Sequence, residues 1–355
     1  MNGRELLGEV WRNLLSGTTR AALFGLAFAA VVGALAVADA RAVVALHQRA
    51  AEFVAAGASV RVLSVAANVD GNACDALGDV PGVVSSGALA EDGTLLLAAM
   101  PDNPLPTYRV TPGMAAVLGV RAESASGVWV SSRTAETLRA GPGQVVDTDT
   151  GPVTLAGVFD YPDDGRDSRL GYAVLVPEPA AGTFDQCWAD VRPPTDGADE
   201  MLRWAVRPGA AQGLSVTQGQ LNPTLGAEFD GAAEFAGRPT RFALPAAALA
   251  GLVLGFVSVR LRRLELAGAL HVGVSRGALL AGAVLETAAW TLAGLALALC
   301  SLVVAAHVGN PADPWDAVLV DARGPAAAAL AALAGAAAAA SLVRERHLFR
   351  YFKDR

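Results

Sequence analysis

The chain has 355 residues, of which 53% are hydrophobic and 17% charged, and its mean hydropathy is +0.40. An average soluble domain carries about 25% charged residues, so this composition indicates a membrane protein. The formal net charge is −7, and we expect no nucleic acid partner. The only lysine is Lys353, which is followed by Asp354, so the chain lacks the Gly-Lys-Ser/Thr sequence of a P-loop. This excludes a P-loop ATPase, although such an ATPase can be a partner.

The first twenty residues predict an amphipathic helix. Its apolar face would carry Leu6, Leu7, Val10, Trp11, Leu14 and Leu15. A helix of this kind at residues 1–20 is typical of one that lies on membrane lipid at the inner leaflet. The alternative is a simple extension of the apolar segment that follows.

Four apolar segments, at residues 21–40, 242–259, 278–306 and 325–343, are candidates for membrane spans. A spanning helix needs about 20 mostly apolar residues. The first segment ends in the sequence ADA at 38–40, which resembles a signal-peptide cleavage site, but its length and the residues before it favour a span. The fourth is rich in alanine, and a buried soluble helix is its alternative reading. We expect a membrane protein with four transmembrane helices.

Residues 41–240 separate the first two spans and change in pattern along their length. The first part continues the helical periodicity, as an outward stalk of the first span would. The sequence SVRVLSVA at 59–66 alternates as a strand does. Residues 127–162 predict a strand, a short helix capped by Ser131 or Ser132, and two further strands separated by turns. Pro-rich turns are expected near 101–106 and 193–197. The insert is therefore predicted to be an α+β domain of many short strands.

The three cysteines fall into two groups. Cys74 and Cys187 lie in the insert, whereas Cys300 lies in the third apolar segment. If the insert is outside the cell, the first two can oxidise, and we expect a Cys74–Cys187 disulfide. Two separate buried thiols are the alternative.

No motif for chemistry on a substrate is present in the sequence. The acidic stretch DYPDDGRD invites a calcium site, but in the register of a calcium loop that starts at Asp160, Pro162 takes a ligand position. No Ser/His/Asp or Cys/His set, catalytic carboxylate pair or Gly-rich phosphate loop is recognisable. We expect no catalytic, metal or cofactor-binding residues, and therefore no enzyme.

Basic residues gather before the first span, between the second and third, and after the fourth. They are Arg4, Arg12, Arg20, Arg260, Arg262, Arg263, Arg276, Arg344, Arg346, Arg350, Lys353 and Arg355. Basic residues near span ends favour the cytoplasmic side. We therefore expect a multi-pass protein of the cell membrane, with both termini (1–20 and 344–355) inside and residues 41–240 outside.

Residues 260–277, which we call the elbow, connect the second and third spans. Arginines end the second span, where the helix dipole also favours cations. A short amphipathic helix is predicted next, with Leu264, Leu266, Ala267 and Leu270 on one face and Glu265 on another. Gly273 suits the left-handed residue that ends a helix, and Ser275 suits the N-cap of the next one. Such an elbow is suited to the docking of a soluble partner protein.

Two features inside the spans need an explanation. Glu286 is an acid within the third span, where charge is costly and usually functional or paired. It couples a proton, or it pairs with a basic group such as Arg276 or one on a neighbouring subunit. Gly251 and Gly255 form a G-x-x-x-G sequence in the second span, which predicts a helix-packing face.

The elbow resembles the signature of FtsX/MacB-type ABC transporter permeases. The resemblance rests on the order Arg262-Arg263-x-Glu265-aliphatic, then Gly273-x-Ser275-Arg276, then the acid Glu286 seven residues after Leu279. The wider plan is also similar: an inner-leaflet helix, one span, a large outer domain and three further spans. This sequence departs from the family at Leu270, His271-Val272 and Gly277, which makes its elbow less basic.

The resemblance implies a permease subunit without its own ATPase. A separate ABC ATPase subunit, which holds the ATP and magnesium, would dock on the elbow, and a second permease chain would pair with this one. The coupling residues would be Arg262, Arg263, Glu265, Gly273, Ser275 and Arg276. ATP-driven movement of the outer domain would export or extract a lipophilic or peptide cargo. Alternatives are mechanotransmission or sensing that controls an extracytoplasmic partner, such as a cell-wall hydrolase or a peptide, and a membrane-anchored binding protein.

Overall fold

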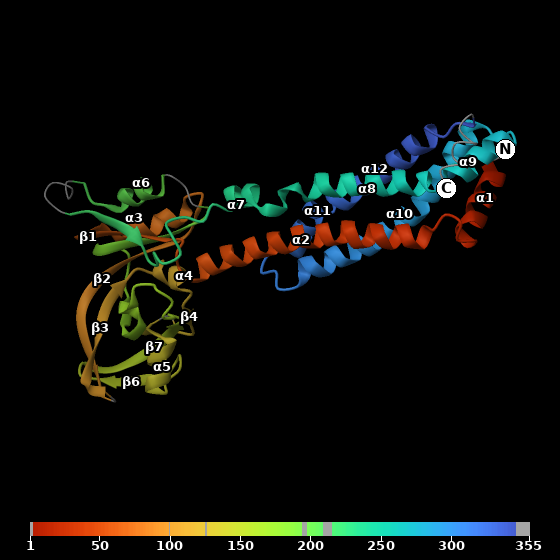
Figure 1. The fold of residues 1–355 in the computed structure, drawn as a ribbon. Coiled ribbons are helices and arrows are strands. Elements are labelled where there is room, and N and C mark those ends of the chain that lie inside the picture. Colours follow the sequence, from red (N-terminus) through yellow and green to blue (C-terminus); the bar gives the residue numbers. More distant parts are fainter. Residues whose placement is uncertain (1–2, 99, 125, 194–196, 209–214, 346–355) are drawn as a thin grey trace. The chain divides into compact units, whose positions relative to one another are not determined.

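The computed structural model describes residues 3–98, 100–124, 126–193, 197–208 and 215–345. The chain divides into two compact units (Figure 1). The helical unit comprises Met1–Arg49 and Gly231–Arg355, and the sheet unit comprises Ala50–Asp230. Four of the basic residues that predict the orientation of the spans fall in 346–355, outside the described residues.

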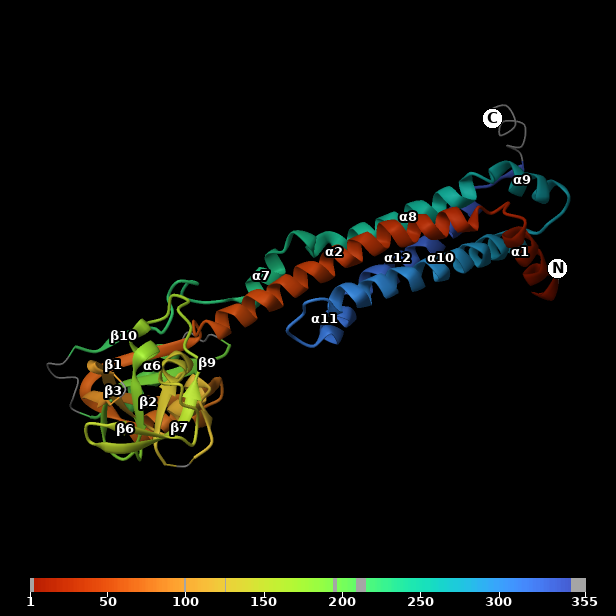
Figure 2. The same ribbon diagram turned by 90° about the horizontal axis from the view of Figure 1, so that it is seen from below.

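The helical unit is built from long helices that run side by side (Figures 1 and 2). Its elements are α1 Gly3–Leu15, α2 Ala21–Ala55, α7 Gly231–Gly237, the 3₁₀ helix η4 Pro239–Phe242, α8 Ala243–Arg260, α9 Arg263–His271, α10 Arg276–His307, α11 Pro314–Asp321 and α12 Arg323–Ser341. The apolar segments predicted as spans are helical, except for Leu342 and Val343 at the end of the fourth. The predicted stalk is helical too, because α2 continues without a break to Ala55. The sequence reading missed α7, η4 and α11.

Four helical stretches are long and apolar enough to cross a membrane in the described part of the chain. They are Ala21–Ala55, Pro239–Arg260, Arg276–His307 and Pro314–Ser341. The Pro314–Ser341 stretch has the lowest hydropathy of the four, which reflects its many alanines. The chain is therefore a candidate four-span membrane protein with a mixed α/β domain.

The interior of the helical unit is filled by small and aromatic side chains. Trp290 of α10 packs against Phe24 and Phe28 of α2, with ring centroids 5.7 and 6.2 Å apart. Ala328 and Ala332 of α12 complete this cluster and are fully buried. Small residues let the helices approach closely, and close packing rather than hydrophobic exclusion holds helices together in lipid.

The sheet unit contains one mixed sheet in the order β10-β1-β9-β2-β3-β8-β5-β7-β4, with β6 pairing with β2 and β7. The strands are β1 Val60–Asp70, β2 Val83–Leu97, β3 Met100–Val110, β4 Arg121–Ala122, β5 Val128–Ser131, β6 Val145–Thr148, β7 Gly151–Phe159, β8 Val174–Pro177, β9 Thr183–Val191 and β10 Thr217–Gln220. Short helices join them: α3 Gly71–Ala76, η1 Leu77–Asp79, α4 Met114–Leu118, α5 Ser132–Leu138, η2 Ser168–Tyr172, α6 Ala198–Leu202 and η3 Arg203–Ala205. Pairs β3–β8 and β5–β7 are parallel, and the other pairs are antiparallel.

The predicted pattern over 127–162 is confirmed, whereas the predicted turn at 101–106 is wrong. Ser131 caps α5 by accepting a hydrogen bond from the Thr134 N–H at 3.1 Å. Residues 101–106 instead lie within β3, which pairs with the 15-residue strand β2. The register of that pair shifts twice between Glu91 and Leu97, so prolines, which lack an N–H, fit a ladder that is already irregular. Residues 194–196 of the other expected turn lie outside the described residues.

Candidate functional site at the elbow

The backbone of the elbow has the predicted form. Helix α8 ends at Arg260, α9 covers Arg263–His271, and α10 begins at Arg276. Gly273 has a φ of +95°, a left-handed conformation that glycine adopts without a Cβ clash. Ser275 caps α10, since its hydroxyl accepts a hydrogen bond from the Ala278 N–H at 3.3 Å. The two turn residues thus act as the sequence predicted.

Arg262 is the centre of the elbow's polar contacts. Its guanidinium donates to both carboxylate oxygens of Glu265, at 3.0 and 2.7 Å, and also forms an ion pair with Glu286. The Arg262 side chain is only 12% exposed and that of Glu286 only 10%. Burial by itself would lower the pKa of Arg262, but the bonds to Glu265 and Glu286 raise it above its ordinary value. The arginine therefore stays charged between two carboxylates.

Glu286 pairs with a basic group, as expected, but its partner is Arg262 rather than Arg276. Arg276 is exposed at the start of α10, and the described contacts give it no bond to Glu286. Glu286 instead pairs with Arg262 and accepts a hydrogen bond from the Asn13 amide of α1 at 2.8 Å. Arg262 precedes α9 and turns back toward α10, which places its long side chain beside the acid. No sequence pattern indicated Asn13, because its partner lies 273 positions away.

Helix α9 is anchored on its other side to the end of the described chain. Ala267 and Val343 are both buried in one small cluster, against which Leu264, Leu266 and Leu270 pack. This is the apolar face predicted for α9, and Glu265 is half-exposed as expected. His271 lies 2.9 Å from a carboxylate oxygen of Glu345. The elbow is thus fastened to the helical unit on two sides.

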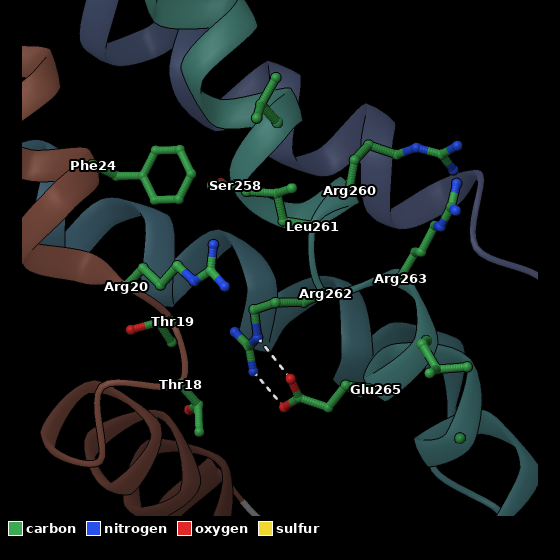
Figure 3. A pocket seen from close by; sticks show the side chains of 13 residues that line it. Thr18, Thr19, Arg20, Phe24, Ser258, Arg260, Leu261, Arg262, Arg263 and Glu265 are labelled. Carbon is green, nitrogen blue, oxygen red and sulfur yellow. Dashed lines mark hydrogen bonds and ion pairs between the residues drawn. The ribbon is translucent and has the colours of Figure 1, made fainter. Parts of the chain in front are cut away.

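A cavity of about 770 Å³ opens beside the elbow (Figure 3). Its walls come from the α1–α2 linker, the first turn of α2, the end of α8 and the start of α9. Four arginines line it, namely Arg20, Arg260, Arg262 and Arg263, together with Glu265. Figure 3 shows Arg262 bonded to Glu265 within this space. The cavity therefore carries an excess of positive charge.

The glycines of the second span form the predicted packing face. A Cβ on Gly251 would clash with the Ala328 carbonyl of α12, and one on Gly255 with the Ala332 carbonyl. A Cβ on Gly335 of α12 would likewise clash with the Leu252 carbonyl of α8. The backbones of α8 and α12 therefore touch at three positions where only glycine fits.

A second polar cluster, which the sequence reading missed, involves the acid of the ADA sequence. Asp39 of α2 accepts hydrogen bonds from Arg238 at 2.8 Å and from the Thr240 hydroxyl at 2.6 Å. The carboxyl group of Asp321 in α11 interacts with that of Asp39. Asp321 is 5% exposed, and neither of its carboxylate oxygens has a donor partner in the described residues. An acid inside an apolar run was the available signal.

The sheet unit carries the disulfide and several surface ion pairs. Cys74 of α3 and Cys187 of β9 are bonded, and Cys300 is a free thiol. Hydrogen bonding to Arg121 lowers the pKa of Asp160, and hydrogen bonding to Arg166 lowers that of Asp164. Within the described ranges, no three His, Cys, Asp or Glu residues are grouped so as to hold a metal ion.

Comparisons with known proteins gave partial structural likenesses. No family model and no curated protein matches the chain. The periplasmic region of MacB from Actinobacillus actinomycetemcomitans is similar over 41% of this chain and 80% of that chain, at 10% identity and a TM-score of 0.30. A domain assigned to a permease protein from Porphyromonas gingivalis covers 46% of this chain and 90% of its own, at 16% identity and a TM-score of 0.31.

A third likeness is to the extracellular domain of the noncanonic ABC-type transporter YknZ from Gram-positive bacteria. It covers 46% of this chain and all of that domain, at 14% identity and a TM-score of 0.30. At these identities and TM-scores, the likenesses establish neither the family nor the function.

Proposed function

We propose that the chain is the membrane subunit of an ABC transporter of the FtsX/MacB type. A separate ATPase subunit would dock on the elbow, and its ATP-driven movement would be passed to the sheet unit outside the cell. The transporter would export or extract a lipophilic or peptide cargo. The observation that carries the proposal is the Arg262 network, which ties the elbow to α10 and, through Asn13, to α1.

Rigid helices support a mechanical role. Helix α10 runs for 32 residues from the elbow, and α2 runs for 35 residues from the helical unit into the sheet unit. An unbroken helix transmits displacement along its axis because its hydrogen bonds are all internal. A force applied at the elbow therefore has a direct route to α10.

The filled interior of the helical unit favours movement of the outer domain over a channel. Trp290, Phe24 and Phe28 occupy the space between α2 and α10. The buried acids of the described helices belong to two separate groups, the Arg262 network and the Asp39 cluster, rather than to one continuous polar path. The same observation supports the second candidate function, in which the chain passes force to an extracytoplasmic partner such as a cell-wall hydrolase.

Affinity purification of the tagged full chain in mild detergent, followed by mass spectrometry, tests the proposal. We expect an ATP-binding subunit to co-purify and to be lost in Glu265→Arg. Because this change also breaks the Glu265–Arg262 pair, Arg276→Glu provides a second variant at an exposed elbow position. Glu123→Arg, an exposed glutamate of the sheet unit, is the matched control and should retain the subunit.

The outcomes separate the candidates. A folded preparation with no ATP-binding subunit contradicts the proposal and favours a membrane-anchored binding protein. An ATPase subunit together with a wall enzyme bound to the sheet unit favours mechanotransmission. ATPase activity stimulated by a lipophilic compound or a peptide favours transport.

A further inference from the structure

The cavity beside the elbow holds more positive charge than the Arg262 network uses. Arg262 is neutralised by Glu265 and Glu286. Arg20 and Arg260 line the same cavity, and the contacts of the described residues give neither of them an ion pair. Arg263 adds a further guanidinium to the lining. Arg20 and Arg260 thus offer an anion positive charge that no carboxylate among the described contacts neutralises.

The apolar part of the lining belongs to the candidate membrane spans. Phe24 lies in the first turn of α2, and Val257 and Leu261 lie at the end of α8. Val257 and Leu261 are 38% and 58% exposed, so they present an apolar surface beside the guanidinium groups. A site with arginines at one end and membrane-facing aliphatic side chains at the other fits an amphipathic ligand.

The position of the cavity matches the depth of lipid headgroups. Arg20 immediately precedes α2, and Arg260 is the last residue of α8, so both stand where a candidate span ends. Helix α1, next to it in the chain, exposes Leu7, Trp11 and Leu15, as a helix that lies in the interface does. Arginine near a span end snorkels toward phosphate groups.

We propose that this cavity binds the phosphate of an anionic phospholipid, with an acyl chain along Val257 and Leu261. Guanidinium groups bind phosphate oxygens through paired, charge-assisted hydrogen bonds, which Arg20 can supply, while Arg260 adds positive charge on the other side of the cavity lining (Figure 3). The cavity volume of about 770 Å³ suits a headgroup, since ligand sites span about 300–1,000 Å³.

Bound lipid would contact the cavity lining on two sides. Its phosphate would lie at Arg20 of the α1–α2 linker, and its headgroup would extend toward Arg260 at the end of α8. The lipid would therefore hold the elbow against the first span. This inference rests on the candidate spans and stands whether or not an ATPase docks on the elbow.

The test is the thermal stability of the full chain in detergent during titration with defined lipids. Phosphatidylglycerol should raise Tm in a saturable way, whereas phosphatidylcholine and inorganic phosphate should not. The double variant Arg20→Gln with Arg260→Gln should weaken the apparent affinity for phosphatidylglycerol about tenfold or more. The control, Arg12→Gln with Arg276→Gln, removes the same charge from exposed positions outside the cavity and should bind as the unchanged chain does.

Four results would overturn the proposal. Equal stabilisation by phosphatidylcholine would show that no anionic phosphate is recognised. Equal stabilisation by inorganic phosphate would show a free-anion site rather than a lipid site. An equal loss in the control would show general surface attraction. Unchanged lipid binding with loss of a co-purifying protein would make the cavity a protein-docking surface.

A single variant guards against misfolding of the double variant. Arg20 is exposed, so Arg20→Gln should leave the fold intact. It should still weaken the apparent affinity for phosphatidylglycerol severalfold. If Arg20→Gln folds and binds phosphatidylglycerol with unchanged affinity, the proposal fails.

Discussion

Arg262 and Glu286 form an ion pair across the elbow, 24 positions apart in the chain. The pair is nearly buried, and each member has a second partner: Glu265 for the arginine and Asn13 for the glutamate. A buried charge is tolerated when its remaining donors and acceptors are satisfied. This arrangement accounts for an acid inside a candidate span without a proton-coupling role.

Removing one member of this pair should cost more than removing both. Glu286→Ala leaves Arg262 with only one carboxylate in a buried position, a loss of about 3–5 kcal/mol in unfolding free energy. Arg262→Met with Glu286→Ala should cost less than the sum of the single variants by at least about 1 kcal/mol. Denaturant unfolding of the full chain in detergent gives the unfolding free energies of the unchanged chain, the two single variants and the double variant. Additive single effects would contradict the ion pair.

Gly255→Ala should destabilise the helical unit, because its Cβ would clash with the Ala332 carbonyl. Overpacking of this kind costs about 1–3 kcal/mol. Gly277→Ala is the control, since Gly277 lies in helix α10 with open space where a Cβ would stand, and it should gain up to about 1 kcal/mol. In thermal unfolding in detergent, Gly255→Ala should lower Tm and Gly277→Ala should raise it. A neutral Gly255→Ala would show that α8 and α12 are not in contact.

Substitution by asparagine should change Tm in opposite directions at Asp39 and Asp321. Asp39→Asn removes the charge that Arg238 requires and should lower Tm. Asp321→Asn removes a buried carboxylate without a donor and supplies an amide that can donate to Asp39, so Tm should rise. Melting curves of the two variants at neutral pH check the signs. A lower Tm in Asp321→Asn would mean that a donor outside the described contacts satisfies the acid.

The disulfide predicts a simple labelling pattern. After denaturation without reductant, a maleimide should modify only Cys300, whereas reduction should make all three cysteines reactive. Replacing Cys74 and Cys187 by serine removes a cross-link between positions 113 residues apart. In the chain-entropy model this lowers the unfolding free energy by about 4–5 kcal/mol. Mass spectrometry counts the labels. Three labels without reduction would disprove the bond.

Acid should weaken the Asp164–Arg166 contact. Hydrogen bonds from Arg166 hold the pKa of Asp164 below its ordinary value, and Arg166 also donates to the Ala55 carbonyl at 2.8 Å. Because the folded pKa lies below the unfolded value of about 3.9, the stabilisation is full above that pH and disappears as pH falls through the folded pKa.

Asp164→Asn measures this effect. The Tm difference between the unchanged chain and the variant should be positive at pH 6 and shrink toward zero as the pH falls through the lowered pKa of folded Asp164. Asp163→Asn, an exposed neighbour with no ion pair among the described contacts, serves as the control. A pH-independent difference would show that the charge of Asp164 does not matter.

The local features of this protein follow from its amino-acid sequence without knowledge of the packing. Apolar length predicted the four long helices, because a membrane requires about 20 apolar residues whatever the neighbours are. Gly273 and Ser275 were assigned correctly because a left-handed turn and an N-cap depend on the residue's own backbone and side chain. Residues 127–162 were predicted for the same reason, since strand, cap and turn are all short-range patterns.

The pairings between distant residues depend on how the helices and strands pack. Arg262 rather than Arg276 contacts Glu286, because the direction in which the elbow turns sets which arginine reaches the acid. The β2–β3 pair was missed, because its irregular register accommodates prolines that a local reading takes for a turn. The contacts of Asn13 with Glu286 and of Asp39 with Arg238 join positions 273 and 199 residues apart. The packing of whole helices determines which polar side chains meet, and a local sequence pattern does not predict such long-range contacts.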